Sequence, residues 1–152
     1  MNRMFTRTFW PLALAVTGLG GCADAPSPPA RAKAAPATDV GKIQAWQDAE
    51  KVAAQDEGRV TVIGSGDSMR PIYGENTVLV LSKIDFADLK PGMQVGYINE
   101  AGRRVVHVLL ERDGRGWKVQ GLNNDTMDRE RVTRYNLIGV VYASFATDEG
   151  LK

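Results

Sequence analysis

The sequence is poor in the residues that cross-link a chain. Its 152 residues include one cysteine, Cys22, and one histidine, His107. A single cysteine excludes a disulfide within the chain, so a folded domain must be held together by its hydrophobic core. We expect no metal ion and no cofactor.

The chain also lacks an excess of charge of either sign. Nineteen Lys and Arg residues stand against 18 Asp and Glu residues, for a formal net charge of +1. That balance provides no basic footprint for nucleic acid, which we do not expect as a partner. Hydrophobic residues make up 43% of the chain, an ordinary value for one globular domain.

A long hydrophobic run is absent as well. The apolar stretch FWPLALAV, residues 9–16, follows Arg3 and Arg7 and is too short to span a bilayer. This order of a basic and an apolar segment predicts a signal peptide over residues 1–21.

The signal peptide ends in Leu19-Gly20-Gly21-Cys22, which resembles the lipobox of bacterial lipoproteins. The resemblance implies that Cys22 is lipidated and becomes the first residue of the mature protein. The protein would then be lipid-anchored in the bacterial cell envelope, facing the periplasm or the exterior. The alternative is an ordinary secretory signal in which the cysteine is incidental.

Three further segments follow. Residues 22–41 are rich in Pro and Ala and predict an extended tether. Residues 42–58 predict a short amphipathic helix that ends near Gly58, with Asp39 as a possible cap. Its apolar stripe, which we expect to pack in the core, consists of Ile43, Trp46, Ala49, Val52 and Ala53.

Residues 59–147 have the pattern of short strands separated by turns. Six runs are β-branched or alternate in polarity, namely RVTVIGS, TVLVLSK, MQVGYIN, RRVVHVLLE, GWKVQGL and LIGVVYASF. Strands of this length and spacing predict a mostly-β domain, a partly open barrel or coiled sheets.

One turn between strands raises a functional question. The stretch GSGDSMRPIYG, residues 64–74, places Ser68 in a glycine-rich turn directly after a strand. A serine hydroxyl attacks a carbonyl when a neighbouring base removes its proton. Imidazole is the side chain whose ordinary pKa best suits that role near neutrality. If Val106 and Val108 face the core, His107 points the other way, toward a cleft or water.

An acid that orients the imidazole would complete a triad. The polar stretch GLNNDTMDRERV, residues 121–132, offers Asp125 and Asp128. Either residue suits this role, and a solvated loop is the plainer interpretation.

Four stretches together resemble the signal peptidase I family. GSGDSMRPIYGENTVLVL is similar to its nucleophile box, LKPGMQVGYI to its second box, and LIGVVY to its closing strand. VVHVLLERDGRGWKVQGLNNDTMD resembles the histidine strand and the last box of the archaeal and endoplasmic-reticulum subclass. The resemblance covers about residues 59 to 145 and implies the coiled β-sheet domain of signal peptidases and LexA-type proteins.

The resemblance also implies roles for single residues. Ser68 would be the nucleophile, His107 the general base and Asp128 the acid. The Ser68 N–H would donate to the oxyanion. Lys118 is the alternative base, because the usual bacterial members use a lysine.

Three positions depart from the family pattern. Gly66 lacks the serine hydroxyl that helps the oxyanion hole in many members. Met93 stands where an acid is usual, and Leu122 replaces the first aspartate of the last box.

The expected function is a membrane-anchored serine endopeptidase that acts on exported or membrane-associated proteins. Signal peptides with small residues before the cut are plausible substrates by the resemblance. The alternative is a catalytically inactive, peptidase-like binding lipoprotein. A LexA-like self-cleaving protein is a third possibility, and the sequence has neither a DNA-reading helix pair nor the expected lysine.

Overall fold

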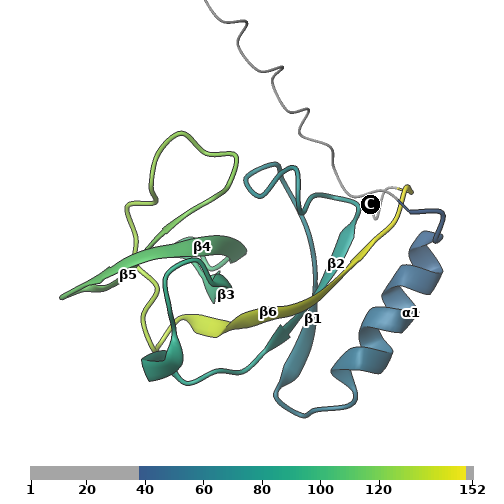
Figure 1. The fold of residues 1–152 in the computed structure, drawn as a ribbon, viewed down its shortest axis with the longest axis horizontal. Coiled ribbons are helices and arrows are strands. Elements are labelled where there is room, and N and C mark those ends of the chain that lie inside the picture. The colour runs from purple at the N-terminus through teal and green to yellow at the C-terminus, as the bar shows by residue number, and fades with distance from the viewer. Residues whose placement is uncertain (1–37, 150–152) are drawn as a thin grey trace, which may run out of the picture. The chain divides into compact units, whose positions relative to one another are not determined.

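The computed structural model describes residues 38–149. The expected signal peptide, Cys22 and most of the expected tether lie outside the described residues. The described chain forms one helix, one short 3-10 turn and six strands (Figure 1). In order they are α1 (Lys42–Ala53), β1 (Arg59–Ile63), β2 (Thr77–Ser82), η1 (Phe86–Asp88), β3 (Gln94–Ile98), β4 (Arg104–Asp113), β5 (Gly116–Gln120) and β6 (Leu137–Ala146).

Helix α1 forms where the sequence predicts a helix, but it differs in three details. It ends at Ala53, five residues before Gly58, and its N-cap is Gly41 without a side-chain cap, so Asp39 does not cap it. Its buried face consists of alanines at four-residue spacing, Ala45, Ala49 and Ala53, which lie one above another on a helix. The expected stripe was therefore partly wrong.

The exposed members of that stripe are its two largest side chains. Ile43 is 70% exposed and Trp46 is 38% exposed. Helix α1 instead approaches the sheet through small side chains, which allow its backbone to lie close to β2 and β6. Close approach of two backbones favours alanine over larger residues at the contact.

All six expected strands are present, and every pairing is antiparallel. They form one sheet in the order β1-β2-β6-β3-β4-β5. Strands β1 and β5 are its two edges and do not pair with each other, so the sheet is open and not a closed barrel. The expectation of a mostly-β domain with one N-terminal helix is confirmed.

Strand β2 lies at the centre of the core because both of its faces are covered. Val78 and Val80 face α1, whereas Leu79 and Leu81 face the opposite side, with Val62 of β1. Val106 of β4 packs in this second cluster although β4 is three places from β2 in the sheet. The sheet must therefore coil until β4 comes back toward β1 and β2.

The coil depends on a glycine in β3. A Cβ added at Gly96 would lie 2.2 Å from Cδ1 of Leu81. The two residues come from strands that both pair with β6. A larger residue at position 96 would force the buried Leu81 side chain or β3 itself to move. This close packing supports the coil, and the coil brings the two halves of the site together.

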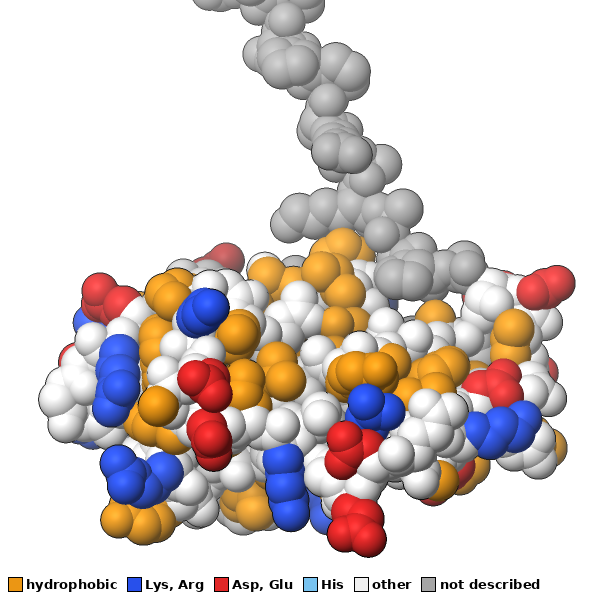
Figure 2. Space-filling view, turned by 60° about the horizontal axis from the view of Figure 1, so that its bottom comes forward, with side chains coloured by type: hydrophobic (Ala, Val, Ile, Leu, Met, Phe, Trp, Pro, Cys, Tyr) orange, Lys and Arg blue, Asp and Glu red, His pale blue; other side chains and the backbone are white. Residues whose placement is uncertain are grey.

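The surface mixes hydrophobic and charged side chains. On the face in Figure 2, orange hydrophobic groups lie among both basic and acidic ones. Among residues 38–149, no helix is long and apolar enough to cross a membrane.

Candidate active site

Ser68 lies in the loop that leaves β1 and returns to β2. The loop is organised by backbone hydrogen bonds, from Arg70 N to the Asp67 carbonyl and from Ile72 N to the Met69 carbonyl, each at 3.1 Å. Buried Met69 anchors it to the domain. Within the described chain, the Ser68 N–H donates to no backbone carbonyl or side chain. This N–H, at the start of the tight turn, is therefore available to donate to a bound ligand.

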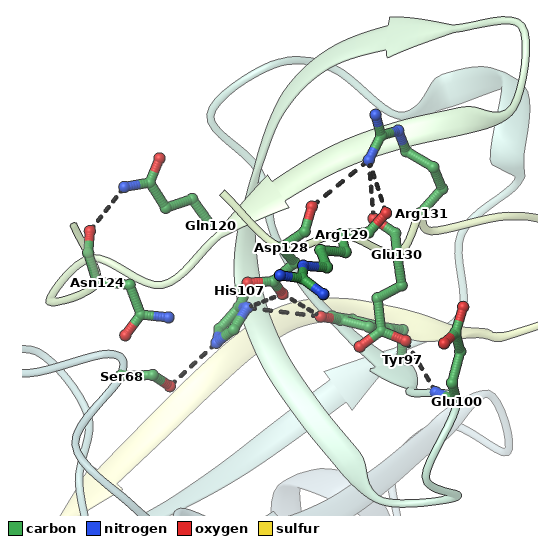
Figure 3. Close-up of polar contacts among 10 residues, drawn as sticks. All are labelled: Ser68, Tyr97, Glu100, His107, Gln120, Asn124, Asp128, Arg129, Glu130 and Arg131. Carbon is green, nitrogen blue, oxygen red and sulfur yellow. Dashed lines mark hydrogen bonds and ion pairs between the residues drawn. The ribbon is translucent and has the colours of Figure 1, made fainter. Parts of the chain in front are cut away.

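His107 lies on β4 and is 6% exposed. It shares a face with Val105 and Leu109, which belong to the core cluster under β3 and β5. It points away from Val106, which packs in the cluster on the other face, and it borders a cleft, one of the two expected environments. The ring is also buried, which the sequence did not predict. Its Nε2 lies 3.0 Å from Oγ of Ser68 (Figure 3).

Asp128 is the carboxylate that meets the imidazole. Its Oδ2 lies 2.6 Å from Nδ1 of His107, and its side chain is 16% exposed. Asp128 N donates to the Val119 carbonyl at 2.9 Å and so ties this loop to β5. Because a carboxylate only accepts, Nδ1 carries the proton, and Nε2 is free to accept the Ser68 hydroxyl proton. Asp125 is exposed and takes no part in these contacts.

Tyr97 is a member of the site that the sequence analysis missed. Its phenol donates to Oδ2 of Asp128 at 2.6 Å, and the side chain is fully buried. Burial, followed by the hydrogen bond to Asp128, raises the pKa of Tyr97 above its usual value, so the phenol stays protonated. The pairing of β3 with β4 provides a signal that could have located Tyr97. Val95 pairs with His107, and Tyr97 is two residues further on, so it lies on the same face of the sheet.

The loop after β5 contacts the turn around Ser68 from the other side. Asn123 N donates to the Ser68 carbonyl at 2.8 Å. Gly121 makes this approach possible, because an added Cβ there would lie 2.6 Å from the Ser68 carbonyl oxygen and 2.9 Å from Ser68 Cβ. The position of Ser68 therefore depends on a glycine more than fifty residues away.

The alternative base is placed elsewhere. The Lys118 ammonium forms an ion pair with Glu111 on β4, and Lys118 does not border the cleft beside Ser68. Among residues 38–149, no group of three or more His, Cys, Asp or Glu side chains is placed to hold a metal ion.

A cleft of about 670 Å³ opens beside the triad. Ser68, Tyr97, His107 and Asp128 border it, and its remaining wall combines apolar side chains with the charged Arg103, Arg104 and Glu130. The apolar part of the wall includes Val62, Leu79, Leu81, Val106 and Ile138. A cleft with an apolar wall and a few convergent polar groups is the usual form of a ligand site.

The three departures from the family pattern fall in different environments. Met93 is partly buried against the core cluster of β3, β4 and β5. Leu122 is 43% exposed. Gly66 borders the cleft with φ +78°, and an added Cβ there would meet no atom within 4 Å. Of the three, only Gly66 borders the cleft.

Comparison with known proteins finds no match: no family model, no curated protein and no solved structure is similar to this chain. The functional argument therefore rests on the residues and their geometry.

Proposed function

We propose that this protein is a serine endopeptidase of the signal-peptidase type, anchored to the membrane by lipid on Cys22. The observation that carries the proposal is the unbroken chain of hydrogen bonds from Ser68 Oγ through His107 to Asp128. These hydrogen bonds join a nucleophile, a base and an orienting acid from three distant parts of the sequence. We further propose that the open, coiled sheet is of the signal-peptidase and LexA type.

Acylation begins when His107 Nε2 removes the hydroxyl proton of Ser68. Oγ bonds to the carbonyl carbon of the peptide, and the carbonyl electron pair moves to its oxygen. Asp128 stabilises the imidazolium that forms. When the tetrahedral intermediate collapses, His107 gives its proton to the leaving amine and the C–N bond breaks, which leaves an ester on Ser68.

Deacylation repeats the sequence with water. His107 removes a proton from a water molecule, which attacks the ester carbonyl. The bond to Ser68 Oγ breaks, Ser68 regains its proton from His107, and a peptide with a free carboxyl group leaves. No electrons are gained or lost overall, so no cofactor is required.

The substrate proposal follows from the expected location. A lipid on Cys22 would hold the cleft close to the outer face of a membrane, where exported and membrane-associated chains emerge. Signal peptides with small residues before the cut are the proposed substrates, and the apolar part of the cleft wall suits their side chains.

The experiment uses the mature protein, a fluorophosphonate probe and a panel of peptides with small residues at the cut. We expect the probe to label Ser68 and the peptides to be cleaved. Ser68→Ala and His107→Ala should each abolish probe labelling and peptide cleavage. The double variant should be little worse than either single variant, because the two residues act on one proton transfer. Asp128→Asn should cost less. Lys118→Ala is the control and should retain activity.

Two results would contradict the proposal. A probe that leaves Ser68 unlabelled, with peptides that bind and are not cleaved, would indicate the peptidase-like binding lipoprotein instead. Loss of activity in Lys118→Ala with retention in His107→Ala would make lysine the base.

A further inference from the structure

One donor that the proposed reaction needs has no evident source in the nucleophile turn. The developing oxyanion is best stabilised by two or more preorganised donors. The Ser68 N–H is one of them. Gly66 supplies no side chain, and the space beside it is open.

A side-chain amide lies on the other side of the nucleophile. A Cβ placed at Gly121 would be 2.9 Å from Nδ2 of Asn124 and also 2.9 Å from Cβ of Ser68. Asn124 Nδ2 and Ser68 Cβ are therefore no more than twice that distance apart. Figure 3 shows the Asn124 amide beside the hydrogen-bonded Ser68 and His107 side chains, with no dashed line of its own.

The Asn124 side chain is a free donor within the described chain. It makes no hydrogen bond there, whereas its backbone is well fixed. Gln120 Nε2 donates to the Asn124 carbonyl at 2.7 Å, and Asn124 N donates to the Gly121 carbonyl at 3.1 Å. This half-buried amide has no partner within residues 38–149, and its backbone is fixed next to Ser68, so it can donate a hydrogen bond to a group bound there.

We propose that Asn124 Nδ2 is the second oxyanion donor of this site and replaces the hydroxyl that is absent at Gly66. The inference rests on the proposed function. As Ser68 Oγ bonds to the peptide carbonyl carbon, the carbonyl π electrons move to its oxygen and the Ser68 proton moves to His107. The oxygen then accepts hydrogen bonds from Ser68 N–H and Asn124 Nδ2–H. Asn124 is in this sense a catalytic residue.

The position of Asn124 follows from the loop that carries it. Gly121 allows the loop to touch Ser68, and the hydrogen bond from Asn123 N to the Ser68 carbonyl sets its register. The residue after Asn123 is thereby directed to the nucleophile. A donor placed before substrate arrives costs no reorganisation during the reaction.

The test compares Asn124→Ala and the isosteric Asn124→Asp with Thr126→Ala, an exposed residue of the same loop. Removing one oxyanion donor costs about 10²- to 10³-fold in kcat in other serine peptidases. We expect a loss of that order in both Asn124 variants with KM little changed, and full activity in Thr126→Ala. A peptide aldehyde, which forms a tetrahedral adduct on Ser68, should lose affinity by a similar factor, whereas a peptide amide of the same sequence should not.

The outcomes separate this inference from the proposed function. If the wild-type protein is labelled and cleaves peptides while Asn124→Ala stays within about threefold of it, the donor role is wrong and the peptidase proposal stands. An equal loss of affinity for the aldehyde and the amide would also overturn the inference, because it would indicate ground-state binding. A wild-type protein that neither labels nor cleaves would overturn both. Each variant must also have the melting temperature of the wild type, which shows that its fold is intact.

Discussion

At the scale of single residues, one carboxylate oxygen joins two parts of the site. Oδ2 of Asp128 accepts from both Nδ1 of His107 and the phenol of Tyr97. Two donors on one oxygen restrict the rotation of the carboxylate and hence of the imidazole. The phenol is therefore expected to position Asp128 without touching substrate.

Replacing Tyr97 with Phe should test this role. The ring still fills the core, so the loss is one buried hydrogen bond to a charged group, about 1.5–3 kcal/mol of unfolding free energy. Peptide cleavage should fall, though less than in Ser68→Ala. Urea unfolding and kcat/KM measure the two effects. Tyr135→Phe, at a residue that is 91% exposed, is the control and should change neither.

The same variant has an expected pH dependence. The folded pKa of Tyr97 is raised above its ordinary value of 10.0. Its contribution to stability is therefore complete below that value and declines as the pH rises above it. The stability advantage of the wild type over Tyr97→Phe should shrink at alkaline pH. A constant difference up to the highest accessible pH would contradict the raised pKa of Tyr97.

At the scale of elements, α1 is held by small side chains in a tight contact. Ala49 is fully buried between α1 and the sheet, against Val78 and Val80 of β2. The contact leaves no room for a larger group, so packing and not helix propensity determines which residue is tolerated.

Ala49→Leu should therefore be destabilising by about 1–3 kcal/mol, the usual cost of overpacking. Ile43→Ser on the same helix should have little effect because Ile43 is 70% exposed. Chemical denaturation of both variants gives the comparison. Equal stabilities would mean that α1 does not pack on β2 in solution.

The turn between β4 and β5 depends on one carboxylate. Asp113 accepts hydrogen bonds from Arg115 N at 2.8 Å, Gly116 N at 3.2 Å and Arg131 Nε at 3.0 Å. The bond from Arg115 N and then that from Arg131 lower the pKa of Asp113 below its ordinary value of 3.8.

Asp113→Asn should consequently lower stability in a pH-dependent way. A carboxyl group with a depressed folded pKa stabilises the protein above its unfolded pKa, and the effect is lost as the pH falls through the folded pKa. The wild type should exceed Asp113→Asn in stability at neutral pH, and the two should converge as the pH falls below 3.8. Urea titrations over the acid range provide the measurement. A difference that grows toward acid would contradict this account.

At the scale of the whole molecule, the expected lipid on Cys22 would determine where the cleft meets its substrates. Two or more acyl chains on Cys22 would give stable membrane attachment without a transmembrane helix. The Pro- and Ala-rich segment would then set how far the domain reaches from the surface.

Cys22→Ser should abolish this attachment. We expect the variant in the soluble fraction or as an uncleaved precursor, with its fold and its cleavage of soluble peptides retained. Membrane fractionation and mass spectrometry of the N-terminus provide the readout. A wild-type mature chain that is unmodified and begins elsewhere would show that the segment is an ordinary secretory signal.

The sequence by itself determined the elements and the chemistry available to them. Alternation of β-branched residues located all six strands, because a strand at a sheet surface must present one apolar face. The single histidine provided the preferred candidate base, with Lys118 as the alternative. The position of His107 on a strand and the glycine-rich turn around Ser68 were both evident from the residues.

Only the tertiary structure decided which faces and which distant residues meet. The ring of His107 is buried because the sheet coils, and α1 uses alanines because the helix lies close to β2. The residues alone left Asp125 and Asp128 open, and the resemblance favoured Asp128. The contacts of Asp128 and Tyr97, and those of Gly121 and Asn124 with the turn around Ser68, depend on the same coil. The local sequence pattern indicates which side chains each strand can bury. The coil that brings β4 back toward β1 arises instead from packing between residues that are far apart in the chain.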